Sequence, residues 1–313
     1  MKIVFFGTTD FAVASLEALI HSSHDVVAVV TNIDTFGGRG RKEIIKSAVS
    51  LFSEEHHIPT FKPKSLKSSK FIATLAEYKA DIFVVVAFRM LPEMVWSLPP
   101  KGTINVHGSL LPAYRGAAPI NWAIIKGEAV TGVSIFQLDH AIDTGNILLQ
   151  KNIPIDENDD FGSLYNKLKI LGSETLIEAL YKIETHQVKN SPQVDALASH
   201  APKLNRDNTK ISFSDNARNI MNLCRGLNPY PGAWLEWDGK IIKIWKALPS
   251  ETKLQPNEWH TDYKSFLEIG CIDGSVVIIE LQPEGKKKMS IKEYLNGVSQ
   301  KLKQIAFDKR FIE

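Results

Sequence analysis

The chain has 313 residues, with 37 Lys and Arg against 35 Asp and Glu, a hydrophobic content of 44% and a charged content of 23%. These globular values exclude an intrinsically disordered chain, and a net charge of +2 is too small to identify a nucleic-acid-binding protein by itself. We expect two domains, because a single core usually stops growing at about 250–300 residues. No apolar stretch approaches the roughly 20 residues of a membrane span. Cys224 and Cys271 lack metal-ligand spacing, which predicts reduced core thiols in a cytoplasmic protein without a metal site.

The first half of the chain alternates short β-branched runs with segments of helical periodicity. The predicted strands are residues 3–6, 26–31, 82–87 and 103–107, and the helices between them include residues 11–20, 44–52 and 71–78. This alternation is typical of a doubly wound, Rossmann-like α/β domain.

A later hairpin, residues 131–137 and 148–153, precedes a long helix predicted over residues 161–183. Asp143 falls between the two hairpin strands, in the run Asp143-Thr144-Gly145, so we expect it on a loop.

The periodic pattern breaks after Glu184 into polar residues with Pro192 and Pro202. Short strands separated by Asp-Gly turns follow a helix near residues 216–227, which predicts a small antiparallel β-barrel. We therefore expect three parts: a catalytic α/β domain at residues 1–188, a linker at 189–206 and a smaller β-barrel domain at 207–313.

The chemistry is predicted by Asn105 and His107, which lie two residues apart in strand 103–107 and so point to the same side near its carboxyl end. An amide N–H can stabilise the oxyanion that forms when an acyl carbonyl becomes tetrahedral, and an imidazole can take a proton from an attacking amine. If Asp143 reaches the imidazole, its carboxylate holds the ring in one tautomer. The three residues together predict acyl transfer to an amine. From the residues alone, a hydrogen-bonded structural His and a turn-forming Asp are alternative interpretations.

The pattern from Asn105 and His107 through Ser109-Leu110-Leu111-Pro112 to Gly116, with Asp143-Thr144-Gly145 downstream, resembles the signature of the 10-formyltetrahydrofolate-dependent formyltransferase family. Further matches run nearly end to end, in the order found in the family members that act on methionyl-tRNA. They are Gly7-Thr8-Thr9-Asp10-Phe11, Gly38-Arg39-Gly40, Gly116-Ala117-Ala118-Pro119-Ile120, Thr131-Gly132-Val133, Asn228-Pro229-Tyr230-Pro231-Gly232-Ala233-Trp234 and Leu281-Gln282-Pro283-Glu284-Gly285-Lys286-Lys287.

The resemblance implies transfer of a formyl group from 10-formyltetrahydrofolate to the α-amine of methionine on initiator tRNA. It also implies an OB-like fold for the second domain and catalytic roles for Asn105, His107 and Asp143. Two loops are implied to hold the folate, and Phe88-Arg89 departs from the Tyr-Gly that is common in the family. The folate-binding residues expected in this way are Phe88, Arg89, Met90, Leu91 and Pro92 on one side and Ser109, Leu110, Leu111 and Pro112 on the other.

Two cationic segments are candidates for contact with tRNA phosphates, although charge runs of this size also occur on ordinary solvated surfaces. The resemblance favours the tRNA interpretation for a Gly-rich loop in the first domain and for a lysine run after a strand in the second. The expected tRNA-binding residues are Arg39, Arg41 and Lys42 in the loop and Lys286, Lys287 and Lys288 in the run.

Three other functions are weighed against this one. A sugar-nucleotide amine formyltransferase would share Asn105, His107 and Asp143, so these residues do not exclude it. A non-catalytic RNA-binding protein would not need them. A Rossmann dehydrogenase is disfavoured, because Gly7-Thr8-Thr9-Asp10 has one glycine where a pyrophosphate-binding turn uses three. We further expect a monomer that does not bind membranes.

Overall fold

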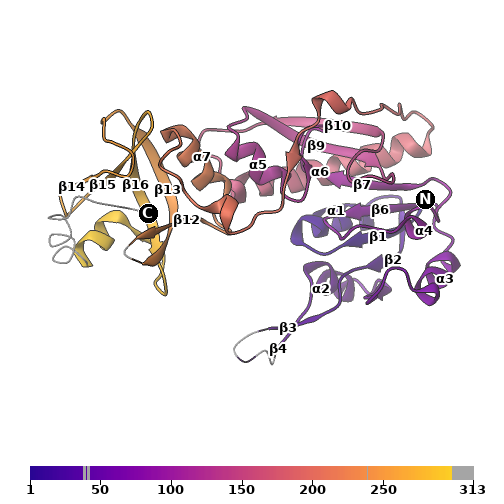
Figure 1. Cartoon of the computed structure of the whole chain (residues 1–313). Helices are drawn as coiled ribbons and strands as arrows, with labels where there is room; N and C mark the ends of the chain where they lie inside the picture. The colour runs from indigo at the N-terminus through magenta and orange to yellow at the C-terminus, as the bar shows by residue number, and fades with distance from the viewer. Residues whose placement is uncertain (38–39, 41–42, 238, 298–313) are drawn as a thin grey trace. The chain divides into compact units, whose positions relative to one another are not determined.

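The computed structural model describes residues 1–37, 40, 43–237 and 239–297. Contacts between Cα atoms divide the chain into two compact units, which are drawn in Figure 1. The first unit contains Met1–Pro119, Val130–Pro154 and Tyr165–Ala201, and the second contains Ile120–Ala129, Ile155–Leu164 and Pro202–Glu313.

The first unit is built on a seven-stranded mixed sheet of order β10-β9-β7-β6-β1-β2-β5. The five strands from β7 to β5 are parallel, and β9 and β10 continue the sheet in antiparallel fashion. The strands are β1 (Lys2–Gly7), β2 (Asp25–Val30), β5 (Thr60–Phe61), β6 (Ile82–Val86), β7 (Thr103–His107), β9 (Val130–Gln137) and β10 (Ile147–Pro154).

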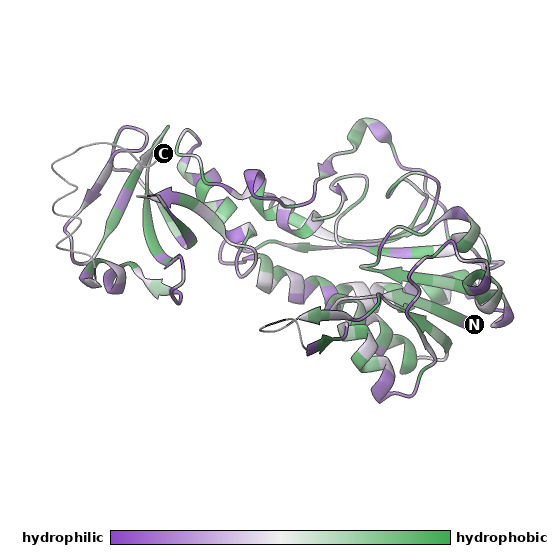
Figure 2. Cartoon of the chain, turned by 60° about the horizontal axis from the view of Figure 1, so that its bottom comes forward, coloured by the Kyte–Doolittle hydropathy of each residue, from purple (hydrophilic) through white to green (hydrophobic). Residues whose placement is uncertain are grey.

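Helices cover both faces of this sheet. On one face, Phe83 and Val85 of β6 share a core with Phe71 and Leu75 of α3. On the other, Gly172 of α6 lies against Val106 of β7 and the ring of α1 residue Phe11. The helices are α1 (Asp10–Ile20), α2 (Ala48–Glu55), α3 (Ser69–Glu77), α4 (Glu93–Trp96) and most of α6 (Phe161–Glu184). Figure 2 shows hydrophobic colouring along the sheet strands. The predicted doubly wound α/β architecture is confirmed.

The prediction of a helix over residues 44–52 was wrong at its start. Residues 43–45 form β4 (Glu43–Ile45), which pairs in antiparallel fashion with β3 (Thr35–Gly37). Helix α2 begins only after Ser47, whose hydroxyl accepts a hydrogen bond from the Ser50 N–H at 3.0 Å and so caps the first turn. The apolar residues before Ser47 belong to the short hairpin.

The second unit contains an antiparallel sheet of order β12-β13-β16-β15-β14, with β17 paired to β16. Helix α7 packs on it through a core that includes Ile220, Cys224 and Leu235. Its elements are α5 (Pro119–Ile125), η2 (Asp207–Thr209), α7 (Ala217–Gly226), β12 (Ala233–Trp237), β13 (Lys240–Ser250), β14 (Trp259–Thr261), β15 (Leu267–Cys271), β16 (Gly274–Pro283) and β17 (Met289–Ser290). The sequence reading missed β14 and β17, which are only three and two residues long.

The predicted linker belongs to the first unit up to Ala201. It contains η1 (Asp195–Leu197) and β11 (His200–Ala201), and β11 pairs with β8 (Arg115–Gly116). Its polar composition therefore reflects hydrogen bonds to the first unit up to Ala201.

Cys224 and Cys271 are buried and form no disulfide, as predicted, and burial raises the pKa of the Cys224 thiol to about 12. Among the residues that the structure describes, no helix combines the length and apolar character that crossing a membrane requires.

Candidate active site

Asn105 and His107 lie on β7, between β6 and β9 in the sheet. Asn105 pairs with Val85, so both side chains face the side of the sheet that carries α3 and α4. His107 is only 7% exposed, whereas Asn105 is half-buried. Within the described residues, the Asn105 side chain has no hydrogen-bond partner in the protein.

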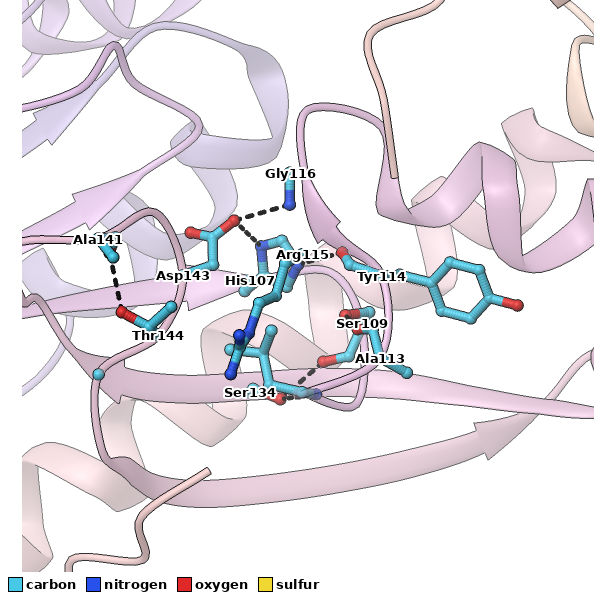
Figure 3. A network of polar contacts seen from close by, with 12 residues as sticks. His107, Ser109, Ala113, Tyr114, Arg115, Gly116, Ser134, Ala141, Asp143 and Thr144 are labelled. Atoms are coloured by element: carbon cyan, nitrogen blue, oxygen red, sulfur yellow. Dashed lines mark hydrogen bonds and ion pairs between the residues drawn. The ribbon is translucent and has the colours of Figure 1, made fainter. Parts of the chain in front are cut away.

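The structure places Asp143 beside the imidazole (Figure 3). Nδ1 of His107 lies 3.8 Å from Oδ2 of Asp143, and Nε2 of the ring lies 2.9 Å from the carbonyl oxygen of Tyr114. The ring also meets Phe136 edge to face, with centroids 6.3 Å apart. The hydrogen bond to Tyr114 and the contact with Phe136 thus fix the plane of the imidazole, with the Asp143 carboxylate facing Nδ1.

Asp143 is held by the backbone around it. The Gly116 N–H donates to Oδ2 of Asp143 at 2.8 Å. Asp143 itself has a φ of 56°, in the left-handed region that Asp tolerates better than most residues. Two residues later, a Cβ on Gly145 would lie 1.7 Å from the Gln137 carbonyl oxygen. Glycine at position 145 therefore allows the loop to pack directly on the end of β9.

Two polar residues that the sequence analysis did not identify hold the loop after β7 through hydrogen bonds. Ser134 donates to the Ser109 carbonyl oxygen at 2.7 Å and accepts from the Leu111 N–H at 2.9 Å. The Gln150 amide donates to Ser134 and to the Leu111 carbonyl oxygen at 2.8 and 2.9 Å. A Ser set between Val133 and Ile135 in a buried strand was the signal that could have identified Ser134.

The loop after β6 starts beside the loop after β7, because Val86 pairs with Val106 in parallel. Phe88 meets the ring of Phe6 edge to face at 5.8 Å, and Leu91 is buried. The side chain of Arg89 turns away toward a neighbouring loop, donating to the carbonyl oxygens of residues 63 and 64 at 2.6 and 3.5 Å. Met90 is exposed, and Pro92 is the N-cap residue of α4.

Of the six predicted tRNA-binding residues, the structure describes three, all in the second unit. Lys286, Lys287 and Lys288 are exposed between β16 and β17 of the second unit, and Lys288 is paired with Glu280 at 2.6 Å. The candidates Arg39, Arg41 and Lys42 lie outside the described residues. Within the described part of the chain, no three His, Cys, Asp or Glu side chains gather as metal ligands would.

Two family profiles match this chain. The profile described as formyl transferase matches residues 1–180, and that described as formyl transferase, C-terminal domain, matches residues 203–299. These matches and the fold define the class of protein, a formyl transferase.

Similar curated proteins indicate which formyl transferase family this chain belongs to. The chain is 42% identical over 308 residues to the methionyl-tRNA formyltransferase of Bacteroides fragilis, covering 95% of each chain. It is 39% identical over 298 residues to that of Geobacter metallireducens, covering 95% of this chain and 96% of the relative. The chain belongs to the methionyl-tRNA formyltransferase family.

Solved structures support the same fold. A sugar 3N-formyl transferase, WlaRD, is 23% identical with a TM-score of 0.67, and the match covers 92% of this chain and 99% of that one. HypX from Aquifex aeolicus in complex with tetrahydrofolic acid is 21% identical with a TM-score of 0.63, covering 94% of this chain and 47% of HypX.

Proposed function

We propose that this protein uses Asn105, His107 and Asp143 to transfer a formyl group from 10-formyltetrahydrofolate to the α-amine of methionine on initiator tRNA. The methionyl-tRNA formyltransferase activity itself follows from family membership over nearly the whole chain. The observation that supports the residue roles is the placement of Asn105 and His107 on one face of β7, with Asp143 at 3.8 Å from the imidazole.

With Nε2–H donating to the Tyr114 carbonyl oxygen, His107 would take a proton at Nδ1 from the methionine α-amine as that nitrogen bonds to the formyl carbon. Asn105 would donate its amide N–H to the carbonyl oxygen, which becomes negative in the tetrahedral state, an effect worth roughly 3 kcal/mol in comparable sites. When the bond between the formyl carbon and N10 of the folate breaks, His107 would return the proton to N10. Asp143 would hold the imidazole in position throughout.

The folate pocket is proposed between the loops at residues 88–92 and 109–112. These loops follow the carboxyl ends of the adjacent parallel strands β6 and β7. A flat heterocycle would be recognised there through main-chain groups. Because the Arg89 side chain is bound to the carbonyl oxygens of residues 63 and 64, it leaves the backbone of its own loop accessible. The Ser109–Pro112 side is held rigid by Ser134 and Gln150. The bound donor would supply the activated formyl group.

The boundaries 1–188 and 207–313 are proposed as the catalytic and tRNA-binding domains, with residues 189–206 between them. Contact with tRNA is proposed for Arg39, Arg41 and Lys42 of the first-domain loop and for Lys286, Lys287 and Lys288 of the second domain. The net positive charge of these segments suits phosphate groups. The cytoplasmic location and the monomeric state stay predictions, which cell fractionation and light scattering would test.

The experiment that tests this function supplies 10-formyltetrahydrofolate with one of three acceptors. The acceptors are methionyl initiator tRNA, methionyl elongator tRNA and an amino-sugar nucleotide. We expect formylmethionyl-tRNA from the initiator species. Formyl transfer only to the sugar nucleotide would contradict the proposal.

A further inference from the structure

We propose that Gln193 is a positioning residue for Asp143, and that buried Arg115 orients its amide. This inference rests on the proposed role of Asp143 beside His107. It concerns a segment whose sequence reads as a linker and which is not part of the motif around Asn105 and His107.

Gln193 makes two hydrogen bonds to the loop that carries Asp143. Its Nε2 donates to the carbonyl oxygen of Asp143 at 2.9 Å and to that of Gly145 at 2.8 Å. The two hydrogens of one amide nitrogen thus tie together the residues on either side of Thr144. Ile142 at the start of this loop is 61% exposed, and Asp143 has a left-handed φ of 56°. Such a conformation persists only where its surroundings enforce it.

Arg115 decides which way the Gln193 amide points. Nε and Nη2 of Arg115 both donate to Oε1 of Gln193, at 3.0 and 2.8 Å. An arginine offers donors only, so the amide oxygen must face it and the amide nitrogen must face the Asp143 loop. Arg115 is 9% exposed and also pairs with Asp195 at 2.9 Å, which balances its charge.

The segment carrying Gln193 is fixed at both ends. Ser191 and Ile147 exchange two backbone hydrogen bonds of 2.9 Å at one end. At the other end, β11 pairs with β8, and a Cβ on Gly116 would lie 2.7 Å from the Ala201 carbonyl oxygen. Gly116 is also the residue whose N–H donates to the Asp143 carboxylate. We call this set, Arg115, Gly116, Gln193 and the Asp143 loop, the brace.

The brace has a kinetic consequence. If Gln193 is truncated, the Asp143 loop loses two hydrogen bonds, one at the carbonyl of Asp143 and one at that of Gly145, while both proposed substrate loops keep theirs. A misplacement of about 1 Å at a catalytic group can slow a reaction on the order of 100-fold, so partial loosening should slow the chemical step by about 10-fold. The KM values for donor and tRNA should change little.

A double-mutant cycle tests the brace in the full-length protein. Single-turnover formylation of methionyl initiator tRNA is measured for the parent, Gln193→Ala, Asp143→Asn and the double variant. We expect Gln193→Ala to lose about 10-fold in the parent but less than about twofold in the Asp143→Asn background, because its effect passes through Asp143. Thermal unfolding and the KM values are measured alongside.

Gln193→Glu is the matched variant if truncation prevents folding. Its carboxylate still accepts from Arg115 but cannot donate to the two loop carbonyls. We expect it to be as slow as Gln193→Ala, whereas a substitution of exposed Leu197 in the same segment, Leu197→Ala, should leave the rate unchanged.

Three results would overturn the inference. Equal losses from Gln193→Ala in both backgrounds, or a rate for Gln193→Ala within about twofold of the parent, would reject the brace while leaving the proposed function intact. A parental rate for Asp143→Asn would reject the role of Asp143 and the brace together.

Discussion

Nδ1 of His107 and Oδ2 of Asp143 are 3.8 Å apart, beyond hydrogen-bond distance, while the Gly116 N–H donates to the same carboxylate oxygen at 2.8 Å. The backbone, rather than the imidazole, therefore fixes the carboxylate in the absence of substrate. Catalytic hydrogen bonds are often long before substrate binds and shorten in the reacting complex. The loop that carries Asp143 must consequently be held to within a fraction of an ångström.

We expect Asn105→Ala to slow formyl transfer about 100-fold, since one oxyanion donor is worth roughly 3 kcal/mol. Its thermal unfolding midpoint should stay close to the parent value, because within the described residues no protein group depends on the Asn105 side chain. Single-turnover rates and calorimetry measure both quantities. A large loss of stability with a normal rate would assign Asn105 a structural role instead.

Gly145→Ala should impair both rate and stability. The new Cβ would overlap the Gln137 carbonyl oxygen at 1.7 Å, so the Asp143 loop or the end of β9 must move. We expect a destabilisation of about 1–3 kcal/mol and a rate loss of at least about 10-fold. The control is Gly297→Ala, where nothing lies within 4 Å of the added atom. Parental behaviour of Gly145→Ala in denaturant unfolding and in single turnover would show that the loop is not tightly placed.

Salt dependence tests the lysines of the second unit one by one. If Lys286 and Lys287 contact phosphates, each Ala variant should lower the slope of log affinity for tRNA against log salt by about 0.7–0.9. Lys288→Ala should lower it less, because Lys288 is already paired with Glu280 at 2.6 Å. Fluorescence titrations of tRNA at several salt concentrations measure the slopes. Unchanged slopes for Lys286→Ala and Lys287→Ala would remove these residues from the tRNA site.

Glu178 of α6 forms ion pairs with Lys151 of β10 and with Lys182, and these predict a stability that depends on pH. Hydrogen bonds from Lys151 and Lys182 lower the pKa of Glu178 to about 2. A carboxyl group with a lowered pKa in the folded state stabilises the protein above its ordinary pKa, and this stabilisation is lost as the pH falls toward 2. The three side chains are at least one-third exposed, so we expect at most about 1 kcal/mol.

The measurement for Glu178 is the difference in unfolding free energy between the parent and Glu178→Gln. That difference should be present at pH 7 and should shrink by pH 3. A difference that does not change with pH would show that the ion pairs contribute nothing to stability.

The positions of some residues in this site could be predicted from the sequence, and those of others could not. Asn105 and His107 follow from the period of two in a buried strand, a local rule that long-range packing did not override. Asp143 required knowing how the β9–β10 connection folds back, which depends on contacts at Gly145 and Gly116 far apart in the chain. Gln193 lies in a polar segment with two prolines nearby, and its hydrogen bonds span 48 and 50 residues. No local pattern encodes such contacts.

Helix α2 shows a related limit of local patterns. Ile44 and Ile45 continue the apolar periodicity of the helix, yet they pair with β3 across the loop. The competing strand pairing is not visible in a local pattern.

The central claim is most directly tested by single-turnover formyl transfer from 10-formyltetrahydrofolate to methionyl initiator tRNA by the parent protein and by His107→Ala, with tRNA affinity measured on the same samples. We predict formylmethionyl-tRNA from the parent, and for His107→Ala a rate lower by about 100-fold or more with tRNA affinity nearly unchanged. A His107→Ala rate within a few-fold of the parent, at equal tRNA affinity, would contradict the account.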